Sequence, residues 1–211
     1  MSMRLGLVRS HTLVEGPGAR FALWVQGCPL RCIGCFNPHF FDFDGGTKVS
    51  QAELHSLLEQ ALREHPEIEG ITLLGGEPFS QAEECSLFAE HAKLLGLSVL
   101  TFTVYTQEAI NKKNLPHWQE LVSVTDVLVA GPFLQHKVDK TRPWLGSTNQ
   151  EYHFLTPRYT MEDFGEPDGI EISIDQEGKV VINGWAETTE VNSLIRGLEG
   201  AITVSSAETG P

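Results

Sequence analysis

The sequence is poor in cysteine and in basic residues, and each shortage excludes a class of protein. Only four of its 211 residues are cysteines, and three of these lie close together, so the chain does not resemble a disulfide-stapled secreted domain. With 15 lysines and arginines against 28 acidic residues, the net charge of −13 argues against non-specific binding to nucleic acid or to an anionic membrane. We therefore expect a protein of the reducing cytoplasm that binds neither partner.

Long apolar runs are also missing. No run approaches the roughly 18–20 residues that a helix needs to cross a bilayer, and residues 1–6 do not have the layout of a signal peptide. The sequence shows no internal repeat and no low-complexity tract. Its 41% apolar and 20% charged residues are ordinary for a globular protein, and 211 residues suit one domain with a sizeable core.

Strand-like and helix-like segments alternate as far as Gly131. Apolar and β-branched runs predict four strands, at 21–26, 71–74, 98–104 and 126–129. Helical periodicity follows Ser50 and Ser80, each with a glutamate three residues later as in a capping box, and a third helix is predicted over 115–122. This alternation predicts crossover units in a parallel sheet, with functional loops at the carboxyl ends of the strands.

The pattern loosens after Gly131. We expect a long loop over 134–150 and a β-hairpin formed by 170–174 and 179–182 around a turn at 176–178, able to add an antiparallel edge to the sheet. A final helix is indicated by apolar residues between 191 and 198, and the tail from 205 to 211 is expected to be disordered.

Three of the four cysteines form one short loop. Cys28, Cys32 and Cys35 have the spacing C-x3-C-x2-C and directly follow the first predicted strand. A cubane iron–sulfur cluster normally takes four thiolates, so a cluster held by three keeps one iron open, as reactive metal sites do. On this loop alone a structural zinc site is nearly as good an interpretation, because His39 can complete a Cys3His set.

The segment Gly75-Gly76-Glu77-Pro78 at the end of the second predicted strand decides for iron, since a zinc knuckle has no use for it. With the cysteine loop it resembles the radical S-adenosylmethionine (SAM) enzymes, and more closely the activating proteins of anaerobic ribonucleotide reductase. Further matching segments lie at 15–20, 26–37, 146–150 and 155–159, so the resemblance spans roughly residues 10–160.

Two positions depart from the family pattern. Most radical SAM enzymes carry an aromatic residue before the third cysteine, where this chain has Gly34 and places Phe36 just after. The reductase activators share this glycine, so it narrows the subfamily. Val104 occupies a position where relatives often have glycine, so the SAM pocket is expected to differ from theirs at this point.

The resemblance implies a fold and a reaction. The fold is α/β, a partial, open β/α barrel of radical SAM type in one domain over 1–211, with its core at about 10–160 and a C-terminal hairpin extension at about 165–204. A complete eight-fold barrel needs about 250 residues. The reaction is reductive SAM cleavage at a [4Fe-4S] cluster, fed by a flavodoxin- or ferredoxin-type donor. It yields a 5′-deoxyadenosyl radical that installs a glycyl radical on a partner enzyme.

Two alternatives to this activase remain. One is a radical SAM enzyme that acts on a small molecule or a peptide, and the other is a non-catalytic zinc-binding interaction domain. Scaffolds of this kind host many reactions, so the chemistry of the site transfers better than the identity of the substrate.

The resemblance also assigns residues. The cluster falls to Cys28, Cys32 and Cys35, and no catalytic side chain is expected beyond the cluster and SAM. The residues assigned to SAM are Gly75, Gly76, Glu77, Pro78, Phe36, Asn37 and Thr103. Simpler explanations exist for several of these: a tight glycine loop, an Asn turn before a proline, and a core position for Phe36.

The remaining candidates receive structural interpretations. Cys85 lies on the apolar face of the second predicted helix and is expected to be a buried, inert thiol. Arg20 is the best candidate among three arginines to meet a carboxylate, a phosphate or a partner surface. No role is assigned to Arg142, Arg158, His11, His39 or His153, and His55 and His91 are expected to be solvated.

Overall fold

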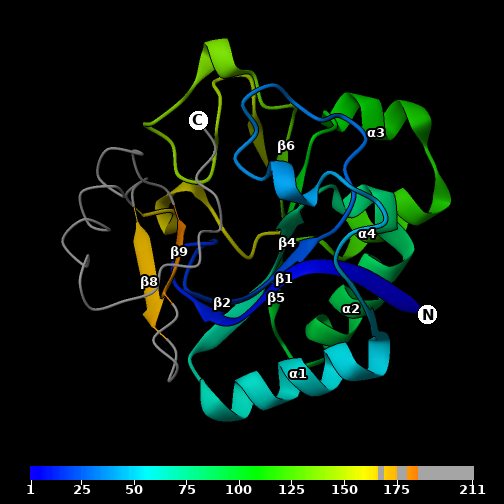
Figure 1. Cartoon of the computed structure of the whole chain (residues 1–211), viewed down its shortest axis with the longest axis vertical. Coiled ribbons are helices and arrows are strands. Elements are labelled where there is room, and N and C mark those ends of the chain that lie inside the picture. Colours follow the sequence, from blue (N-terminus) through cyan, green and yellow to red (C-terminus); the bar gives the residue numbers. More distant parts are fainter. Residues whose placement is uncertain (166–168, 175–179, 185–211) are drawn as a thin grey trace.

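The computed structural model describes residues 1–165, 169–174 and 180–184, and its centre is one mixed seven-stranded sheet (Figure 1). The strand order is β3-β1-β2-β4-β5-β6-β7, so the sheet is open. The strands are β1 Ser2–Thr12, β2 Ala19–Val25, β3 Thr47–Ser50, β4 Ile68–Gly75, β5 Ser98–Thr103, β6 Val127–Ala130 and β7 Glu151–Phe154. β2, β4, β5 and β6 run parallel, and the α/β class with a parallel centre is therefore confirmed.

The outer strands are antiparallel to this centre. β1 pairs with β2 and β3, and β7 pairs with β6. The helices are α1 Gln51–Glu64, α2 Ala82–Leu94, α3 Gln107–Lys113 and α4 Pro116–Val124, and short 3-10 turns lie at Pro38–Phe40, Pro78–Gln81, Gln135–Lys137 and Met161–Asp163. None of the helices in the described ranges is both long and apolar enough to cross a membrane.

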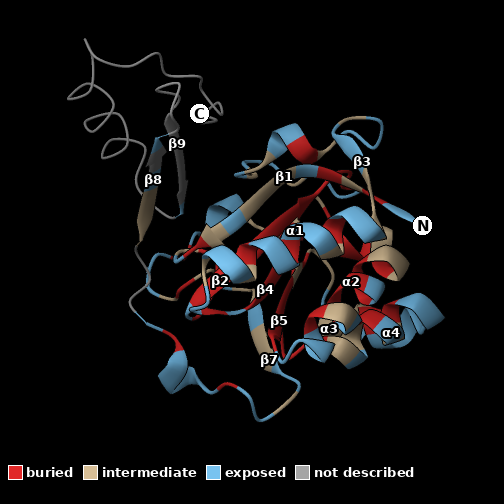
Figure 2. Cartoon of the chain, turned by 90° about the horizontal axis from the view of Figure 1, so that it is seen from below, coloured by how far each residue is buried: buried red, intermediate tan, exposed pale blue. Residues whose placement is uncertain are grey.

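Alternate residues of the parallel strands face two different layers. Phe21, Leu23 and Val25 of β2 join the main core, which also contains Leu58 of α1 and Phe88 of α2. The residues between them, Ala22 and Trp24, belong to a smaller cluster on the opposite face. Because both faces are covered, the central strands are buried along their length (Figure 2).

The two faces are covered by different kinds of structure. The helices pack on one face, whereas irregular segments cover the other with Phe40 next to Trp24, and with Leu145, Tyr159 and Phe164 next to β5 and β6. The loops that carry the sequence motifs therefore leave the carboxyl edge of a sheet whose strands are fixed by two apolar layers.

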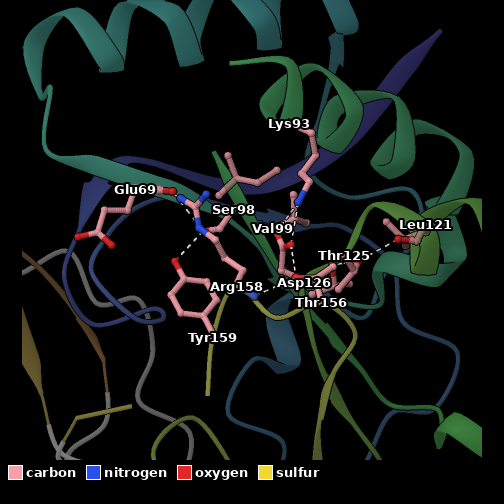
Figure 3. Close-up of polar contacts among 12 residues, drawn as sticks. Glu69, Lys93, Ser98, Val99, Leu121, Thr125, Asp126, Thr156, Arg158 and Tyr159 are labelled. Carbon is pink, nitrogen blue, oxygen red and sulfur yellow. Dashed lines mark hydrogen bonds and ion pairs between the residues drawn. The ribbon is translucent and has the colours of Figure 1, made fainter. Parts of the chain in front are cut away.

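A buried carboxylate holds several of these elements together. The Asp126 side chain is 2% exposed and accepts hydrogen bonds from Lys93 Nζ of α2 at 2.7 Å, from the Val99 amide of β5 at 2.8 Å and from Thr156 Oγ1 at 2.6 Å (Figure 3). A buried charge is tolerated when it is paired and bonded in this way. The network ties α2 to the sheet and to the segment after β7.

Of the two capping boxes predicted at helix starts, one is present and the other is absent. Ser50 and Glu53 form the expected capping box at the start of α1. The box predicted for Ser80 and Glu83 is absent, because the Glu77 carboxylate accepts from the Phe79 amide and starts a 3-10 turn that runs into α2. The third predicted helix is confirmed as α4.

Other differences concern the edges of the fold. The sequence did not predict β1, β3, β7 or α3. The hairpin is confirmed as β8 Ile170–Ile174 and β9 Val180–Gly184, but it forms a sheet of its own instead of an added edge. The long loop over 134–150 is confirmed apart from its short 3-10 turn. The predicted turn at 176–178, the final helix and the tail lie outside the described residues.

Candidate metal centre

The cysteine loop, residues 28–35, leaves the carboxyl end of β2 and is fixed at its base. The Gly27 amide donates to the Phe40 carbonyl at 2.8 Å, and the Cys28 amide donates to the Phe41 carbonyl at 3.2 Å. Cys28 is buried, whereas Cys32 and Cys35 are half-buried. The loop turns through positive φ at Arg31 and Gly34. Cys32 and Cys35 are thus presented near the surface from a hydrogen-bonded base that holds Cys28 in the interior.

Backbone amides point at two of the three sulfur atoms. Burial raises the pKa of the Cys28 thiol, and hydrogen bonds from the Arg31 and Leu30 amides oppose that rise. Burial likewise raises the pKa of Cys35, opposed by the Asn37 amide, whose nitrogen lies 3.4 Å from the sulfur. Amide donors favour the thiolate, which is the form that binds metal.

The Gly-Gly-Glu-Pro loop, residues 75–78, leaves the adjacent strand β4 and is bonded directly to the base of the cysteine loop. The Gly76 amide donates to the Val25 carbonyl at 2.8 Å, and the Glu77 amide donates to the Gly27 carbonyl at 2.9 Å. A β-carbon on Gly76 would lie 2.5 Å from the Gly27 carbonyl oxygen. Gly75 has a φ of +105°, and its β-carbon would lie 2.6 Å from Trp24 Cα. Packing between the two loops is therefore enough to require both glycines.

Glu77 turns its carboxylate into the protein. It is fully buried and accepts from the Phe79 amide at 2.8 Å, from Thr103 Oγ1 at 3.0 Å and from the Val104 amide at 2.7 Å. Burial raises the pKa of Glu77 to about 7, against the opposing effect of these three donors. The side chain thus joins the loop after β4 to the end of β5. Thr103 and Val104 were both singled out from the sequence. In the structure they donate hydrogen bonds to the Glu77 carboxylate.

A hollow of about 450 Å³ opens beside the cysteine loop. It lies between residues 30–33 and residues 132–136, and Cys32 is part of its wall. Phe36, for which a core position was considered, is 55% exposed and packs edge-on against Phe133, with ring centroids 5.2 Å apart. The loop also exposes Ile33, at 82%. An open surface that carries exposed apolar side chains therefore lies beside Cys32.

The three thiols are not gathered as a bound zinc ion would gather them. A tetrahedral zinc ion with Zn–S bonds of about 2.3 Å draws its sulfur ligands to within about 4 Å of one another. Within the described ranges, the three cysteines do not bring their sulfur atoms into such a group, and His39 does not join one. A cubane cluster holds each thiolate on a different iron, and so accepts ligands that are farther apart.

Some candidates from the sequence lie away from this site. Arg20, predicted to meet a ligand or a partner, is fully buried instead and donates to Thr72, Ser98 and Tyr159, and to the Ile71 carbonyl. Figure 3 shows Tyr159 beside Ser98 in this network. Cys85 is fully buried and its pKa is raised by burial, as expected for an inert thiol.

The other arginines and histidines have structural surroundings. Arg142 pairs with Asp139 at 2.5 Å, and Arg158 is exposed. His153 Nε2 lies 3.6 Å from Glu151. His55 and His91, predicted to be solvated, are half-buried and stack with ring centroids 3.8 Å apart, so that prediction was wrong.

Sequence reasoning missed the residues that hold the far wall of the hollow. Ser147 is fully buried and accepts from the Leu134 amide at 3.1 Å. Gln150 Oε1 accepts from the Gly146 amide at 2.8 Å, and its amide group donates to the Gly131 carbonyl at 2.9 Å. The motif at 146–150 signalled importance, but its spacing alone did not indicate this bracing role.

Comparisons with known proteins agree with this geometry. The family described as "4Fe-4S single cluster domain" matches residues 14–153. The anaerobic ribonucleoside-triphosphate reductase-activating protein of Salmonella typhi is 29% identical over 147 residues, which cover 68% of this chain and 93% of that protein. Its Escherichia coli K12 counterpart is 28% identical over 147 residues, with the same coverage.

A second kind of activating enzyme is also similar. The pyruvate formate-lyase-activating enzyme of Clostridium pasteurianum is 38% identical over 84 residues, or 38% of this chain and 34% of that protein. The matches confirm the resemblance found in the sequence and the prediction of an iron–sulfur enzyme of the activating type.

Proposed function

Because the chain belongs to the family of 4Fe-4S single cluster domains, we propose that Cys28, Cys32 and Cys35 hold one [4Fe-4S] cluster at which SAM is cleaved. The resulting 5′-deoxyadenosyl radical takes a hydrogen atom from a backbone glycine of a partner enzyme, such as an anaerobic ribonucleotide reductase. A flavodoxin- or ferredoxin-type protein in a reducing cytoplasm supplies the electron.

One observation carries this proposal: the cysteine loop and the Gly-Gly-Glu-Pro loop are hydrogen-bonded to each other at the carboxyl edge of β2 and β4. Two motifs separated by some forty residues meet there, beside the hollow at Cys32. In parallel α/β folds this edge is where ligands bind. A structural metal knuckle would need no such neighbour.

The donor set fits a cluster. One loop supplies all three thiols, and backbone amides are directed at Cys28 and Cys35, which favours their charged forms. When bound by three thiolates, a [4Fe-4S] cluster supplies an open iron for the amino and carboxylate groups of SAM and the electron that breaks its C5′–S bond.

The protein's own part is to position and to shield. Main-chain carbonyls of the Gly-Gly-Glu-Pro loop are the candidates to receive the amino group of SAM, because the amides of Gly76 and Glu77 already hold the loop in place. Glu77 is a positioning residue, since its carboxylate faces inward and fixes the loop against Thr103 and Val104. Phe36 and Asn37, which directly follow the cysteine loop, are the further candidates to contact SAM.

The open sheet is part of the proposal. A partial barrel of radical SAM type, with one domain whose core runs from about 10 to 160, leaves room at its carboxyl edge for a large substrate. The exposed apolar residues Ile33 and Phe36 beside the thiols suit a protein partner better than a small molecule.

The decisive test starts from anaerobically reconstituted protein given SAM and a chemical reductant. We expect close to four irons per chain and the formation of 5′-deoxyadenosine. Adding the cognate glycyl-radical enzyme must then give an organic radical in electron paramagnetic resonance that disappears when the partner's candidate glycine is replaced by alanine. Consumption of a small molecule or peptide in place of this signal identifies the rival radical SAM enzyme, and stoichiometric zinc without sulfide identifies the interaction domain.

A further inference from the structure

A second group of metal-ligating side chains lies at the opposite end of the sheet. His11 is the next-to-last residue of β1, His65 follows α1, and Glu67 directly precedes β4. Thr12 pairs with Arg20 and Ala19 pairs with Ile68, so these segments meet at the amino end of β2. β2 has seven residues, which puts this end about 20 Å from the cysteine loop. The group is therefore separate from the candidate metal centre.

The ligand atoms of these residues already converge. His11 Nε2 lies 3.1 Å from Glu67 Oε1, and His65 Nδ1 lies 3.4 Å from the same oxygen. One ligand atom from each residue lies within 4.8 Å of the other two, and no other His, Cys, Asp or Glu group in the described ranges meets that condition. Tetrahedral zinc with bonds of about 2.0–2.1 Å places neighbouring ligand atoms about 3.3 Å apart. Two of the three separations therefore already have the required length.

A further observation indicates that the pairing within the group is incomplete. His11 Nε2 is buried and makes no hydrogen bond, although the Glu67 oxygen is near, because the geometry of that contact is not that of a hydrogen bond. The two imidazole rings are stacked, with centroids 4.5 Å apart. Imidazole lone pairs lie in the ring plane, so a turn of one ring out of this stack would let both nitrogens and the carboxylate bind one cation.

The backbone around the group is held in place. The His65 amide donates to the Ala61 carbonyl at 2.7 Å, and the His65 carbonyl accepts from the Ile68 amide at 3.1 Å, so a tight turn places His65 and Glu67 together. The side chains of His11, His65 and Glu67 are 24%, 37% and 57% exposed, which leaves an open side for entry and for water.

We propose that His11, His65 and Glu67 form a binding site for a divalent transition metal, with zinc as the best fit. Two imidazoles and one carboxylate are a ligand set that zinc accepts, with water in the fourth position. The bound ion would fasten the end of β1 to the connection between α1 and β4. The proposal does not depend on the function proposed for the cysteine loop.

The test uses the full chain with its iron–sulfur cluster in place, so that the three cysteines are occupied. The protein is dialysed against micromolar Zn²⁺, and iron and zinc are counted separately. We expect one zinc per chain, with only nitrogen and oxygen neighbours in X-ray absorption at the zinc edge. His11→Ala and His65→Ala should each weaken zinc binding by about tenfold or more.

Matched variants keep the test decisive. His117→Ala removes another exposed imidazole that lies 3.6 Å from a glutamate, and it should leave zinc binding unchanged. Glu67→Gln changes an exposed side chain without altering its size, so it serves if a histidine variant fails to fold. Equal zinc binding in His11→Ala or Glu67→Gln and in the wild type, sulfur among the zinc neighbours, or no zinc retained by the wild type would each overturn the proposal.

Discussion

The cysteine loop and the Gly-Gly-Glu-Pro loop leave adjacent parallel strands, yet the protein holds them in opposite ways. Beyond its base, the cysteine loop is exposed, with Ile33 82% accessible and two of its three thiols half-buried. The Gly-Gly-Glu-Pro loop turns its one charged side chain inward, where three donors satisfy it.

The difference indicates that the two loops have separate roles in the candidate site. Under the proposed function, the group that reaches a cofactor and a large partner has to be exposed, whereas the surface against which the cofactor is positioned has to be rigid. The Glu77 amide of the Gly-Gly-Glu-Pro loop donates to the Gly27 carbonyl at the base of the cysteine loop. The Gly-Gly-Glu-Pro loop therefore helps to hold the base of the cysteine loop in place. Variants can separate these two roles.

The largest effect is expected from the thiols. Cys28→Ala, Cys32→Ala or Cys35→Ala should each abolish SAM cleavage, because two thiolates cannot retain the cluster. Cys85→Ala should keep full iron content and lose about 0.5–1.5 kcal/mol of stability, as for one buried methyl group. Iron analysis and a 5′-deoxyadenosine assay check both results. Loss of the cluster in a folded Cys85→Ala protein would contradict the assignment.

The second prediction breaks the connection between the loops. Gly76→Ala places a β-carbon 2.5 Å from the Gly27 carbonyl oxygen and 2.9 Å from that of Phe40, so backbone must move. We expect a loss of about 1–3 kcal/mol, measured by denaturant unfolding, together with reduced cluster retention. Gly165→Ala is the control, because among the described residues no atom beyond its chain neighbours lies within 4 Å of its β-carbon. Equal stability of the two variants would show that the loops are not coupled there.

The third prediction concerns the inward carboxylate. In Glu77→Gln, one carboxylate oxygen becomes an NH₂ group, which then faces hydrogen-bond donors that bind oxygen in the wild type. We expect this mismatch to lower the free energy of unfolding by about 1–3 kcal/mol. Burial raises the pKa of Glu77 to about 7, so between about pH 4.5 and 7 the folded chain holds a proton that the unfolded chain has released. This contribution to stability is therefore complete at low pH and is lost as the pH rises to about 7.

The pH dependence makes this test specific. The stability difference between wild type and Glu77→Gln should be larger at pH 5 than at pH 7.5, as measured by urea unfolding at both values. A difference that grows with pH would mean that the three donors outweigh burial and that the carboxylate is charged throughout.

The smallest effect on stability is expected from the exposed side of the cysteine loop. Ile33→Ser should change stability by less than about 0.5 kcal/mol, because the side chain is 82% exposed. It should nevertheless lower the yield of glycyl radical on the partner while leaving 5′-deoxyadenosine formation without the partner unchanged. Leu94→Ser, at an 86% exposed position at the end of α2, is the matched control. Equal radical yields in both variants would remove Ile33 from the docking surface.

Local sequence signals predicted much of the fold. Four strands, the hairpin and the α1 capping box were found because each depends on neighbours in the sequence. β1 also carried a signal that was not used, since Met3, Leu5 and Leu7 alternate with other residues. β3 and β7 have four residues each, as β6 does, but their residues are exposed or half-buried, so they lack the continuous apolar run that marked β6.

The errors arose where another group, either close by or distant in the sequence, became the partner of a residue in place of the expected one. The Glu77 carboxylate accepts a hydrogen bond from the Phe79 amide, and a 3-10 turn begins there. As a result α2 does not begin with the predicted capping box at Ser80. A charged side chain such as that of Arg20 is usually found at the surface. Here the hydroxyl groups of Ser98 and Tyr159 accept hydrogen bonds from the guanidinium group, which allows Arg20 to be buried. His55 and His91 left the solvent because α1 and α2 place their rings face to face.

By itself, the sequence predicted the donor set and its chemistry: three thiols at a spacing that leaves a fourth position open, and a glycine-rich loop one strand later. Only the tertiary structure decided that these two loops share hydrogen bonds, and that His11, His65 and Glu67 meet at the other end of β2. The reason is physical. Spacing within a loop is set by the chain itself, whereas contacts between distant segments depend on strand order and on which side chains the packed layers leave exposed.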